Sequence, residues 1–268
     1  MIENPGAARI RKLAQLARKK ERLAQRKFLV EGPHATLEAL QHTPETVATV
    51  FASDRALAAE PKLERLANTH GVRIERATEK VIAALSDTVT PQGVVAVVNI
   101  PEPVRLEELR QPRLVAVLHE VRDPGNAGTV IRVADAAGAD AVILTGDSTD
   151  PWHPKVVRAS TGSLFHIAVL QSHDLGATLE TLRDRGLTTV AADLSGEDLS
   201  SADNTLQNPT AWVFGNEARG LDAHSVQLCD RAAKLPIYGK AESLNLATAA
   251  AVCLYTTAFA QRSAQPSR

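Results

Sequence analysis

Three polar stretches in the C-terminal half of the sequence each follow an apolar run, and each carries residues that could bind a ligand. A loop that leads from a strand into a helix presents backbone N–H groups at the carboxyl end of that strand, where α/β proteins bind their ligands. Three loops of this kind could converge on one site. The stretches are HEVRDPGNAGTVIRVADAAG (119–138), FGNEARGL (214–221) and LPIYGKAESLN (235–245).

The first stretch places an arginine near a predicted turn. Residues 124–128 (PGNAG) are typical of a tight turn, and the apolar spacing after them indicates a helix. Arg132 lies on the second turn of that predicted helix, after Asn126. Because helical side chains lean toward the N-terminus, its guanidinium could reach back over the turn. The stretch lacks G-x-G-x-x-G, which disfavours a dinucleotide-binding fold.

The other two stretches carry their own candidate residues. Glu217 lies between Gly215 and Gly220, and Gly215 permits close approach of the backbone to a ligand. Ser243 is predicted to cap the N-terminus of the Ala-rich last helix. Taken alone, each stretch could equally be a routine turn followed by a cap.

Apolar runs suited to a buried parallel sheet must position these loops. Helical segments separate most of the runs, so residues 113–268 are predicted to form an α/β domain with helices on both faces of the sheet. The predicted strands are LVAVL (114–118), AVILT (141–145), IAVL (167–170), TTVAA (188–192), AWVFG (211–215) and AAKLPI (232–237).

The N-terminal part is predicted to be a second, smaller α/β domain, residues 1–105. Short strand-like and helix-like runs alternate from Phe28 to about Ile100. The segment PEPVRLEELRQP (101–112) is rich in prolines and charges, so we place a linker at 106–112.

Composition excludes several classes of protein. The chain has 268 residues, 44% of them hydrophobic, which is enough for a buried core. Its longest apolar stretch, 246–260, is interrupted by threonines and too short to span a bilayer, and the N-terminus does not resemble a secretory signal. Cys229 and Cys253 show no C-x-x-C spacing, which indicates a reducing cytosol without disulfide or zinc. We therefore expect a cytoplasmic enzyme or binding protein.

Positive charge is concentrated at the N-terminus. Residues 1–30 contain nine basic and two acidic residues, and Ile10, Leu13, Leu16 and Leu23 recur at roughly helical spacing. This pattern predicts an amphipathic helix with a basic face, which could bind phosphate-rich partners or could serve only solubility. The candidates for contact with phosphate groups here are Arg18, Lys19, Lys20, Arg22 and Arg26.

Together, the three stretches resemble the motifs of the SpoU or TrmH class of RNA 2′-O-ribose methyltransferases. The resemblance rests on N-x-G-x-x-x-R (126–132), F-G-N-E-x-x-G-L (214–221) and L-P-I-x(5)-E-S-L-N (235–245), in this order. The N-terminal part is similar to that family's L30e-like substrate-binding domain, through RKFLVEG (26–32) and TPQGVVAVV (90–98). The resemblance covers nearly the whole chain.

This resemblance implies a trefoil-knotted catalytic domain that works as a homodimer and binds S-adenosylmethionine. It implies that Arg158 and Ser160, in VVRASTGSLFH (156–166), contact RNA or support the dimer. Knots are rare exceptions to the usual rules of chain topology, and composition and periodicity do not indicate one. The implied cofactor-binding residues are Ala192, Gly215, Asn216, Leu235, Ile237 and Leu244.

The family assigns the key catalytic role to the arginine matched here by Arg132. That role is often described as the general base, but a guanidinium is hardly ever deprotonated in proteins. The alternative is that Arg132 binds the neighbouring phosphate and stabilises the developing alkoxide, while phosphate or water takes the proton. Methyl transfer from a sulfonium requires no metal, and we expect none, because the eight histidines show no ligand cluster in the sequence. The matched supporting residues are Asn126, Glu217, Ser243 and Asn245.

The main hypothesis is therefore S-adenosylmethionine-dependent 2′-O-methylation of RNA, most simply 23S ribosomal RNA, because the additional domain suits a large structured target. The same reaction on transfer RNA is the first alternative. An RNA-binding factor without turnover is the second, and the presence of all matched motif residues counts against it. A small-molecule α/β enzyme would leave the basic N-terminal segment unexplained.

Overall fold

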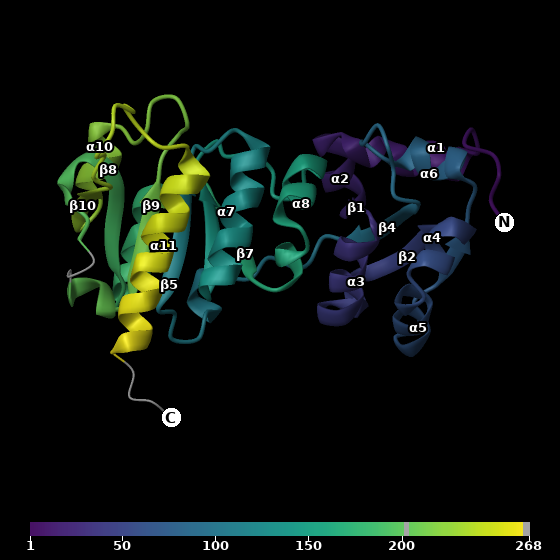
Figure 1. The fold of residues 1–268 in the computed structure, drawn as a ribbon, viewed down its shortest axis with the longest axis horizontal. Helices are drawn as coiled ribbons and strands as arrows, with labels where there is room; N and C mark the ends of the chain where they lie inside the picture. The colour runs from purple at the N-terminus through teal and green to yellow at the C-terminus, as the bar shows by residue number, and fades with distance from the viewer. Residues whose placement is uncertain (201–203, 265–268) are drawn as a thin grey trace. The chain divides into compact units, whose positions relative to one another are not determined.

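The computed structural model describes residues 1–200 and 204–264 and divides the chain into two compact units (Figure 1). Unit 1 comprises Met1–Glu102 together with Trp152–His166, and unit 2 comprises Pro103–Pro151 together with Ile167–Arg268. Within the described ranges, no helix has both the length and the apolar character needed to cross a membrane.

Unit 1 is built on a four-stranded sheet of order β1-β4-β2-β3. Strand β4 pairs antiparallel with β1 and β2, whereas β2 and β3 are parallel. The strands are β1 (Lys27–Glu31), β2 (Val47–Ala52), β3 (Ile74–Arg76) and β4 (Val94–Asn99), and the helices that follow them are α3 (Pro33–His42), α4 (Asp54–Ala59), α5 (Lys62–Thr69) and α6 (Glu79–Leu85). Phe51, Val95 and Val97 pack with Val81 and Ile82 of α6 in the core. The prediction of a small N-terminal α/β domain is confirmed, although α4 and α6 were not foreseen.

The basic N-terminal segment forms two helices where the sequence pattern predicts one. Helices α1 (Ala8–Ala14) and η1 (Gln15–Ala17) are separated from α2 (Lys19–Gln25) by Arg18, whose backbone is extended. The break changes which side of α2 faces the core, so Leu23 is 56% exposed and Arg22 only 1%. The Arg22 guanidinium donates to the carbonyl oxygens of Leu16 and Ala17, at 2.9 and 2.7 Å. The expectation that Arg22 contacts RNA is therefore withdrawn, because its guanidinium is buried inside the domain.

Residues 152–166 belong to unit 1, although the predicted boundary at residue 113 assigned them to the second domain. They form α8 (Pro154–Ser160) and η4 (Ser163–Phe165). The physical reason is aromatic packing: the Phe28 ring lies 4.9 Å from that of Trp152 and 6.5 Å from that of Phe165. A long-range contact of this kind leaves no local pattern in the sequence.

Unit 2 contains a six-stranded sheet of order β10-β8-β9-β5-β6-β7. Every pair of neighbouring strands is parallel, which confirms the predicted fold class. The strands are β5 (Leu114–His119), β6 (Ala141–Thr145), β7 (Ala168–Ser172), β8 (Thr188–Asp198), β9 (Thr210–Phe214) and β10 (Arg231–Lys234). Two short 3-10 helices, η3 (Leu106–Glu108) and η5 (Asn204–Gln207), lie outside the sheet.

Helices cover both faces of this sheet (Figure 1). Alternate side chains of a strand point to opposite faces. Val213 packs in the cluster that contains Leu179 and Leu182 of α9 (Leu175–Asp184), and α10 (Ala223–Gln227) adds to the same side. Trp212, the residue before Val213, points to the opposite face. Its Nε1 donates to the hydroxyl of Thr257, 2.8 Å away, in α11 (Leu246–Ser263). Helix α11 packs against α7 (Pro124–Ala137). Strand order does not test the trefoil knot, which stays a prediction.

Candidate active site

The three predicted loops meet at one edge of the sheet in unit 2. Because β5, β9 and β10 are in one parallel sheet, their carboxyl ends lie on the same side, and the loops after them leave from that side. The loops after β9 and β10, together with the end of β8, line a cavity of about 420 Å³. All six residues predicted to hold a cofactor line it: Ala192, Gly215, Asn216, Leu235, Ile237 and Leu244.

Gly215 is required by the close approach of two backbone segments. A Cβ atom at this position would lie 2.3 Å from the carbonyl carbon of Gly220 and 2.4 Å from the nitrogen of Leu221. The neighbouring residues explain this closeness, since Asn216 and Gly220 exchange backbone hydrogen bonds of 3.1 and 2.8 Å. The second motif therefore folds back on itself through a pair of backbone hydrogen bonds, and position 215 has no room for a Cβ atom.

Glu217 ties the second motif to the first. Its carboxylate accepts hydrogen bonds from the backbone N–H of Arg122 at 3.2 Å and of Asp123 at 3.0 Å. The Asn126 side-chain amide donates to the same carboxylate at 3.4 Å. Glu217 thus holds the loop that precedes α7, which makes it a positioning residue for that loop.

Asn245 ties the third motif to the first. Its Oδ1 accepts from the backbone N–H of Ala247 at 2.9 Å and of Thr248 at 3.3 Å, so it is the cap of α11. Its Nδ2 donates to Oδ1 of Asn126 at 3.1 Å. The prediction of Ser243 as the cap is wrong, because the helix begins at Leu246; Ser243 lines the cavity instead. Glu217, Asn126 and Asn245 form one hydrogen-bonded chain through all three motifs.

Helix α7 begins earlier than the sequence predicts. Pro124 is its first residue and Asp123 its cap, with the Asp123 carboxylate accepting from the backbone N–H of Asn126 at 2.8 Å. The predicted turn at 124–128 is therefore wrong, because these residues are already helical, and Arg132 falls on the third turn rather than the second. Arg132 is exposed and does not line the cavity. Within the part of the chain that the structure describes, its side chain has no hydrogen-bond or ion-pair partner.

Burial sets the protonation of two groups in this region. Desolvation raises the pKa of the Cys253 thiol to about 12, and Cys253 lines the cavity. Its thiol is therefore neutral at physiological pH and is not a nucleophile. Desolvation also lowers the pKa of His119 at the end of β5, whose Nδ1 lies 3.0 Å from the hydroxyl of Thr145. Cys229 and Cys253 are both free thiols in the structure.

Sequence reasoning missed several polar groups at this edge. Arg219 forms an ion pair with Glu120, whose carbonyl oxygen accepts from the Asn216 amide at 3.0 Å. Asp193 and Glu242 line the cavity as well. Of these groups, only the role of Asp123 could have been predicted from the sequence, since aspartate directly before proline commonly starts a helix. The pairing of Glu120 with Arg219 joins two loops far apart in the sequence, and nothing local predicts it.

Two histidines lie together with a carboxylate, a group that the expectation of no ligand cluster did not foresee. Ligand atoms of Glu38, His42 and His166 all lie within 4.8 Å of one another in unit 1. The residues that line the cavity of unit 2 include no histidine.

Comparison with known proteins agrees with this arrangement of motifs. A family model described as SpoU rRNA Methylase matches residues 113–255, which include all three motif loops. The chain belongs to the SpoU rRNA methylase family. A second family model, the MRM3-like substrate binding domain, matches residues 7–96 of this SpoU methylase.

Relatives of this SpoU methylase extend over nearly its whole length. The 23S rRNA (guanosine(2553)-2'-O)-methyltransferase RlmP of Bacillus subtilis is 34% identical over 258 residues, 95% of this chain and 97% of that protein. The structure of an AdoMet-bound rRNA methyltransferase from Sinorhizobium meliloti is 29% identical, with a TM-score of 0.83 over 99% of this chain and 98% of that one. The AdoMet complex of AviRb from Streptomyces viridochromogenes also has 29% identity and a TM-score of 0.83, over 96% and 99%.

Proposed function

We propose that this chain is a cytoplasmic enzyme that transfers a methyl group from S-adenosylmethionine to a ribose 2′-hydroxyl in 23S ribosomal RNA. The observation that carries this proposal is the cavity lined by the second and third family motifs, to which hydrogen bonds among Glu217, Asn126 and Asn245 tie the first motif. The name of RlmP, which is similar over 95% of this chain, supports the reaction and the choice of ribosomal RNA.

The cavity suits the proposed cofactor. Its volume of about 420 Å³ lies within the range of small-molecule sites. Leu235, Ile237 and Leu244 supply apolar surface for an adenine ring, and the glycine-containing bridge at Gly215 leaves backbone groups accessible. S-adenosylmethionine supplies, when bound, a methyl group made electrophilic by the sulfonium.

The remaining catalytic work is alignment of the ribose and management of one proton. Ser243 lines the cavity with an exposed hydroxyl, which suits a contact with the ribose or the cofactor. Glu217, Asn126 and Asn245 fix the relative positions of the loops, so the ribose meets a preorganised site. A guanidinium keeps its charge in proteins, so we assign that of Arg132 to a phosphate next to the reacting ribose and to the developing alkoxide, while this phosphate or water takes the hydroxyl proton.

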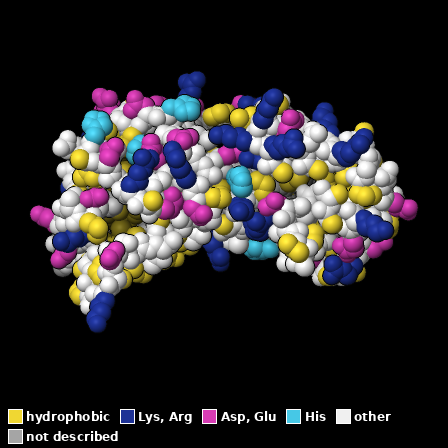
Figure 2. All heavy atoms as spheres, turned by 90° about the horizontal axis from the view of Figure 1, so that it is seen from above, with side chains coloured by type: hydrophobic (Ala, Val, Ile, Leu, Met, Phe, Trp, Pro, Cys, Tyr) yellow, Lys and Arg dark blue, Asp and Glu magenta, His cyan; other side chains and the backbone are white. Residues whose placement is uncertain are grey.

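Unit 1 offers the surface for the RNA phosphates. Arg18, Lys19 and Lys20 are exposed at the break between η1 and α2, and Figure 2 shows Lys and Arg side chains gathered over the side of unit 1 where these helices lie. The other residues predicted to contact RNA are less free to bind it, because they have partners within the protein. Arg26 pairs with Glu102 at 3.2 Å, Arg158 lies 3.6 Å from Asp87, and the buried Ser160 hydroxyl donates to the Val157 carbonyl. The proposed RNA surface is therefore centred on residues 18–20.

The proposal includes a homodimer formed through α11. Val252, Tyr255 and Phe259 are exposed apolar residues on one face of this helix, and Phe259 is 64% exposed. An apolar stripe that a chain leaves uncovered is typical of a two-fold interface, in which the same patch meets its own copy. Phe259→Glu is expected to shift the chain from dimer to monomer in sedimentation velocity, whereas Leu23→Glu, at an exposed apolar site of unit 1, leaves the dimer intact. A dimer that persists in Phe259→Glu contradicts this interface.

The cofactor site is tested by one glycine substitution and its matched control. Gly215→Ala places a Cβ 2.3 Å from backbone and is expected to weaken binding of S-adenosylhomocysteine at least about tenfold in calorimetry, by opening the bridge. Gly239→Ala lies in the third loop with no atom within 4 Å of its Cβ and is expected to bind within a few fold of wild type. Equal affinity in the two variants, or no binding by the wild type, refutes the cofactor assignment.

The reaction itself is tested with RNA from cells that lack the gene. The chain and labelled S-adenosylmethionine are incubated with 23S RNA or with transfer RNA, and the 2′-O-methyl positions are mapped. The proposal expects label at one position of the 23S RNA. Label in transfer RNA alone identifies the alternative substrate, and label in neither indicates a factor without turnover.

A further inference from the structure

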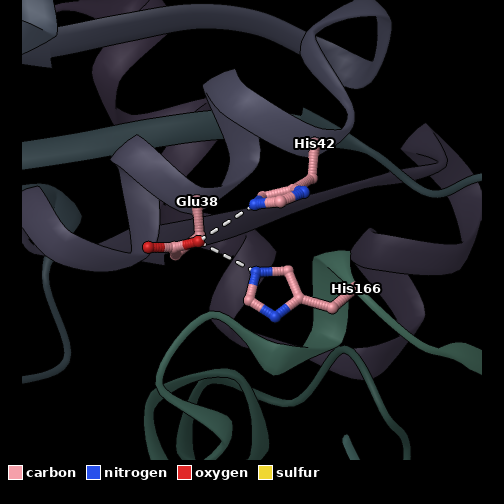
Figure 3. A group of neighbouring side chains, drawn as sticks. All are labelled: Glu38, His42 and His166. Carbon is pink, nitrogen blue, oxygen red and sulfur yellow. Dashed lines mark hydrogen bonds and ion pairs between the residues drawn. The ribbon is translucent and has the colours of Figure 1, made fainter. Parts of the chain in front are cut away.

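A second group of chemically active side chains lies in unit 1 and shares no residue with the cavity. Glu38 and His42 are one turn apart on α3, and His166 follows η4 (Figure 3). The Oε2 atom of Glu38 lies 2.9 Å from Nε2 of His166 and 3.4 Å from Nε2 of His42. A single carboxylate oxygen is thus faced by two imidazole nitrogens from different elements.

The backbone of residue 162 fixes the carboxylate in this position. Gly162 has a φ of +98°, and a Cβ there would lie 2.5 Å from Cγ of Glu38. The loop before η4 therefore packs directly on the Glu38 stem, which leaves the Glu38 side chain only 18% exposed and that of His166 26% exposed. His42 is more open, at 47%, so the cluster is held firmly and has one accessible side.

Charge in this cluster is not balanced by a permanent cation. The ion-pair partners of Glu38 among the described residues are histidines alone: His34 at 3.9 Å, His42 and His166. A carboxylate that is mostly buried requires a positive partner, and a bound cation would supply it.

We propose that Glu38, His42 and His166 bind one divalent transition-metal ion of the zinc type. Two imidazole nitrogens and one carboxylate oxygen are a common donor set for zinc, and imidazole disfavours magnesium and calcium. With metal–ligand bonds of about 2.0–2.1 Å, neighbouring donors of a tetrahedral site lie roughly 3.3 Å apart, close to the 2.9 and 3.4 Å found here. The fourth position is open to water.

The ion has a structural role, because its ligands come from two parts of unit 1. His42 and Glu38 belong to α3, whereas His166 ends the segment Trp152–His166. Bound metal therefore fastens that segment to α3 and stabilises the folded chain by mass action. This site is independent of the methyl-transfer proposal, so either can fail without the other.

The test uses the full-length chain stripped of metal at pH 7.5. Zinc is titrated in competition with a chromophoric chelator, and the expected result is one ion per chain. Outer-sphere partners of a metal already contribute about 10- to 100-fold in affinity, so removal of a direct ligand in His42→Ala or His166→Ala is expected to weaken binding at least tenfold. The matched control is His70→Ala, an exposed histidine at the end of α5, which is expected to bind as the wild type does.

A second measurement keeps the proposal testable if an alanine variant is unstable. Glu38→Gln keeps the side-chain volume, and Co²⁺ in the wild type is expected to give the visible absorption of a four-coordinate site, which Glu38→Gln reduces. Zinc is also expected to raise the melting temperature of the wild type and not that of His166→Ala. Equal zinc affinity in wild type and both alanine variants overturns the proposal. So does a wild type that takes up no zinc and is instead stabilised by acid as its imidazoles gain protons.

Discussion

Arg132→Ala will leave the affinity for S-adenosylhomocysteine within a few fold of wild type while it slows methyl transfer by a factor on the order of 10² to 10³. The first half of this expectation follows from position, since Arg132 is exposed on the third turn of α7 and does not line the cavity. The second half follows from charge, because one preorganised donor at a developing oxyanion contributes about that factor. Calorimetry and single-turnover methylation of the RNA substrate measure the two halves separately.

The controls for Arg132 separate its charge from its shape. Arg132→Lys keeps the charge but loses the planar fork, so a substantial recovery of rate indicates simple electrostatic stabilisation. Arg110→Ala removes the same charge from an exposed position before β5 and is expected to methylate at the wild-type rate. Near-normal turnover of Arg132→Ala contradicts the catalytic assignment. Mixed dimers of Arg132→Ala and Gly215→Ala chains add a further result: recovered turnover means that Arg132 serves the cavity of the partner chain.

Sheet geometry explains why the six residues that the resemblance assigns to the cofactor line one cavity. Strands of a parallel sheet end at one edge, so recognising three loops after three apolar runs is enough to bring them together. Gly215, Leu235 and Leu244 all line the cavity for this reason. The first motif differs, because neither Asn126 nor Arg132 lines the cavity. A position on a helix fixes the direction of a side chain but not which groups it contacts.

Helix ends could be read only approximately. Ser243 and Asn245 are both good caps, and the choice depends on where α11 starts. In the structure Asn245 is the cap, and its side chain also donates to Asn126, 3.1 Å away, a contact that no local pattern indicates. The same limit explains the N-terminal segment, where an extended Arg18 turns Arg22 inward and Leu23 outward.

The proposed metal site is harder still to predict from the sequence. His34, Glu38 and His42 stand at four-residue spacing, which places them on one face of a helix and is visible in the sequence. The third ligand, His166, is 128 residues away from Glu38, and tertiary contacts such as the packing of Phe28 with Trp152 and Phe165 hold its segment in unit 1. A site completed by such packing requires the tertiary structure.

Lys19→Gln with Lys20→Gln will weaken RNA binding and flatten its salt dependence while leaving the modified nucleotide unchanged. Both lysines are exposed at the start of α2. Binding of a phosphate by a lysine releases condensed counterions, so the slope of log affinity against log salt is expected to become shallower by roughly one unit for each phosphate that the variant no longer binds. Affinities measured at several salt concentrations give the slope, and mapping of the methylated position gives the specificity.

The full-length chain is the appropriate setting for this test. A fragment without residues 1–112 would remove Phe28 from Trp152 and Phe165 and would expose their rings, so weaker RNA binding could come from misfolding. The matched control is Lys62→Gln with Arg65→Gln, which removes two exposed positive charges from α5 and is expected to leave the slope unchanged. If the two double variants flatten the slope equally, the N-terminal helices contribute only net charge. The RNA surface of unit 1 must then lie elsewhere, and the basic segment no longer supports the choice of ribosomal RNA.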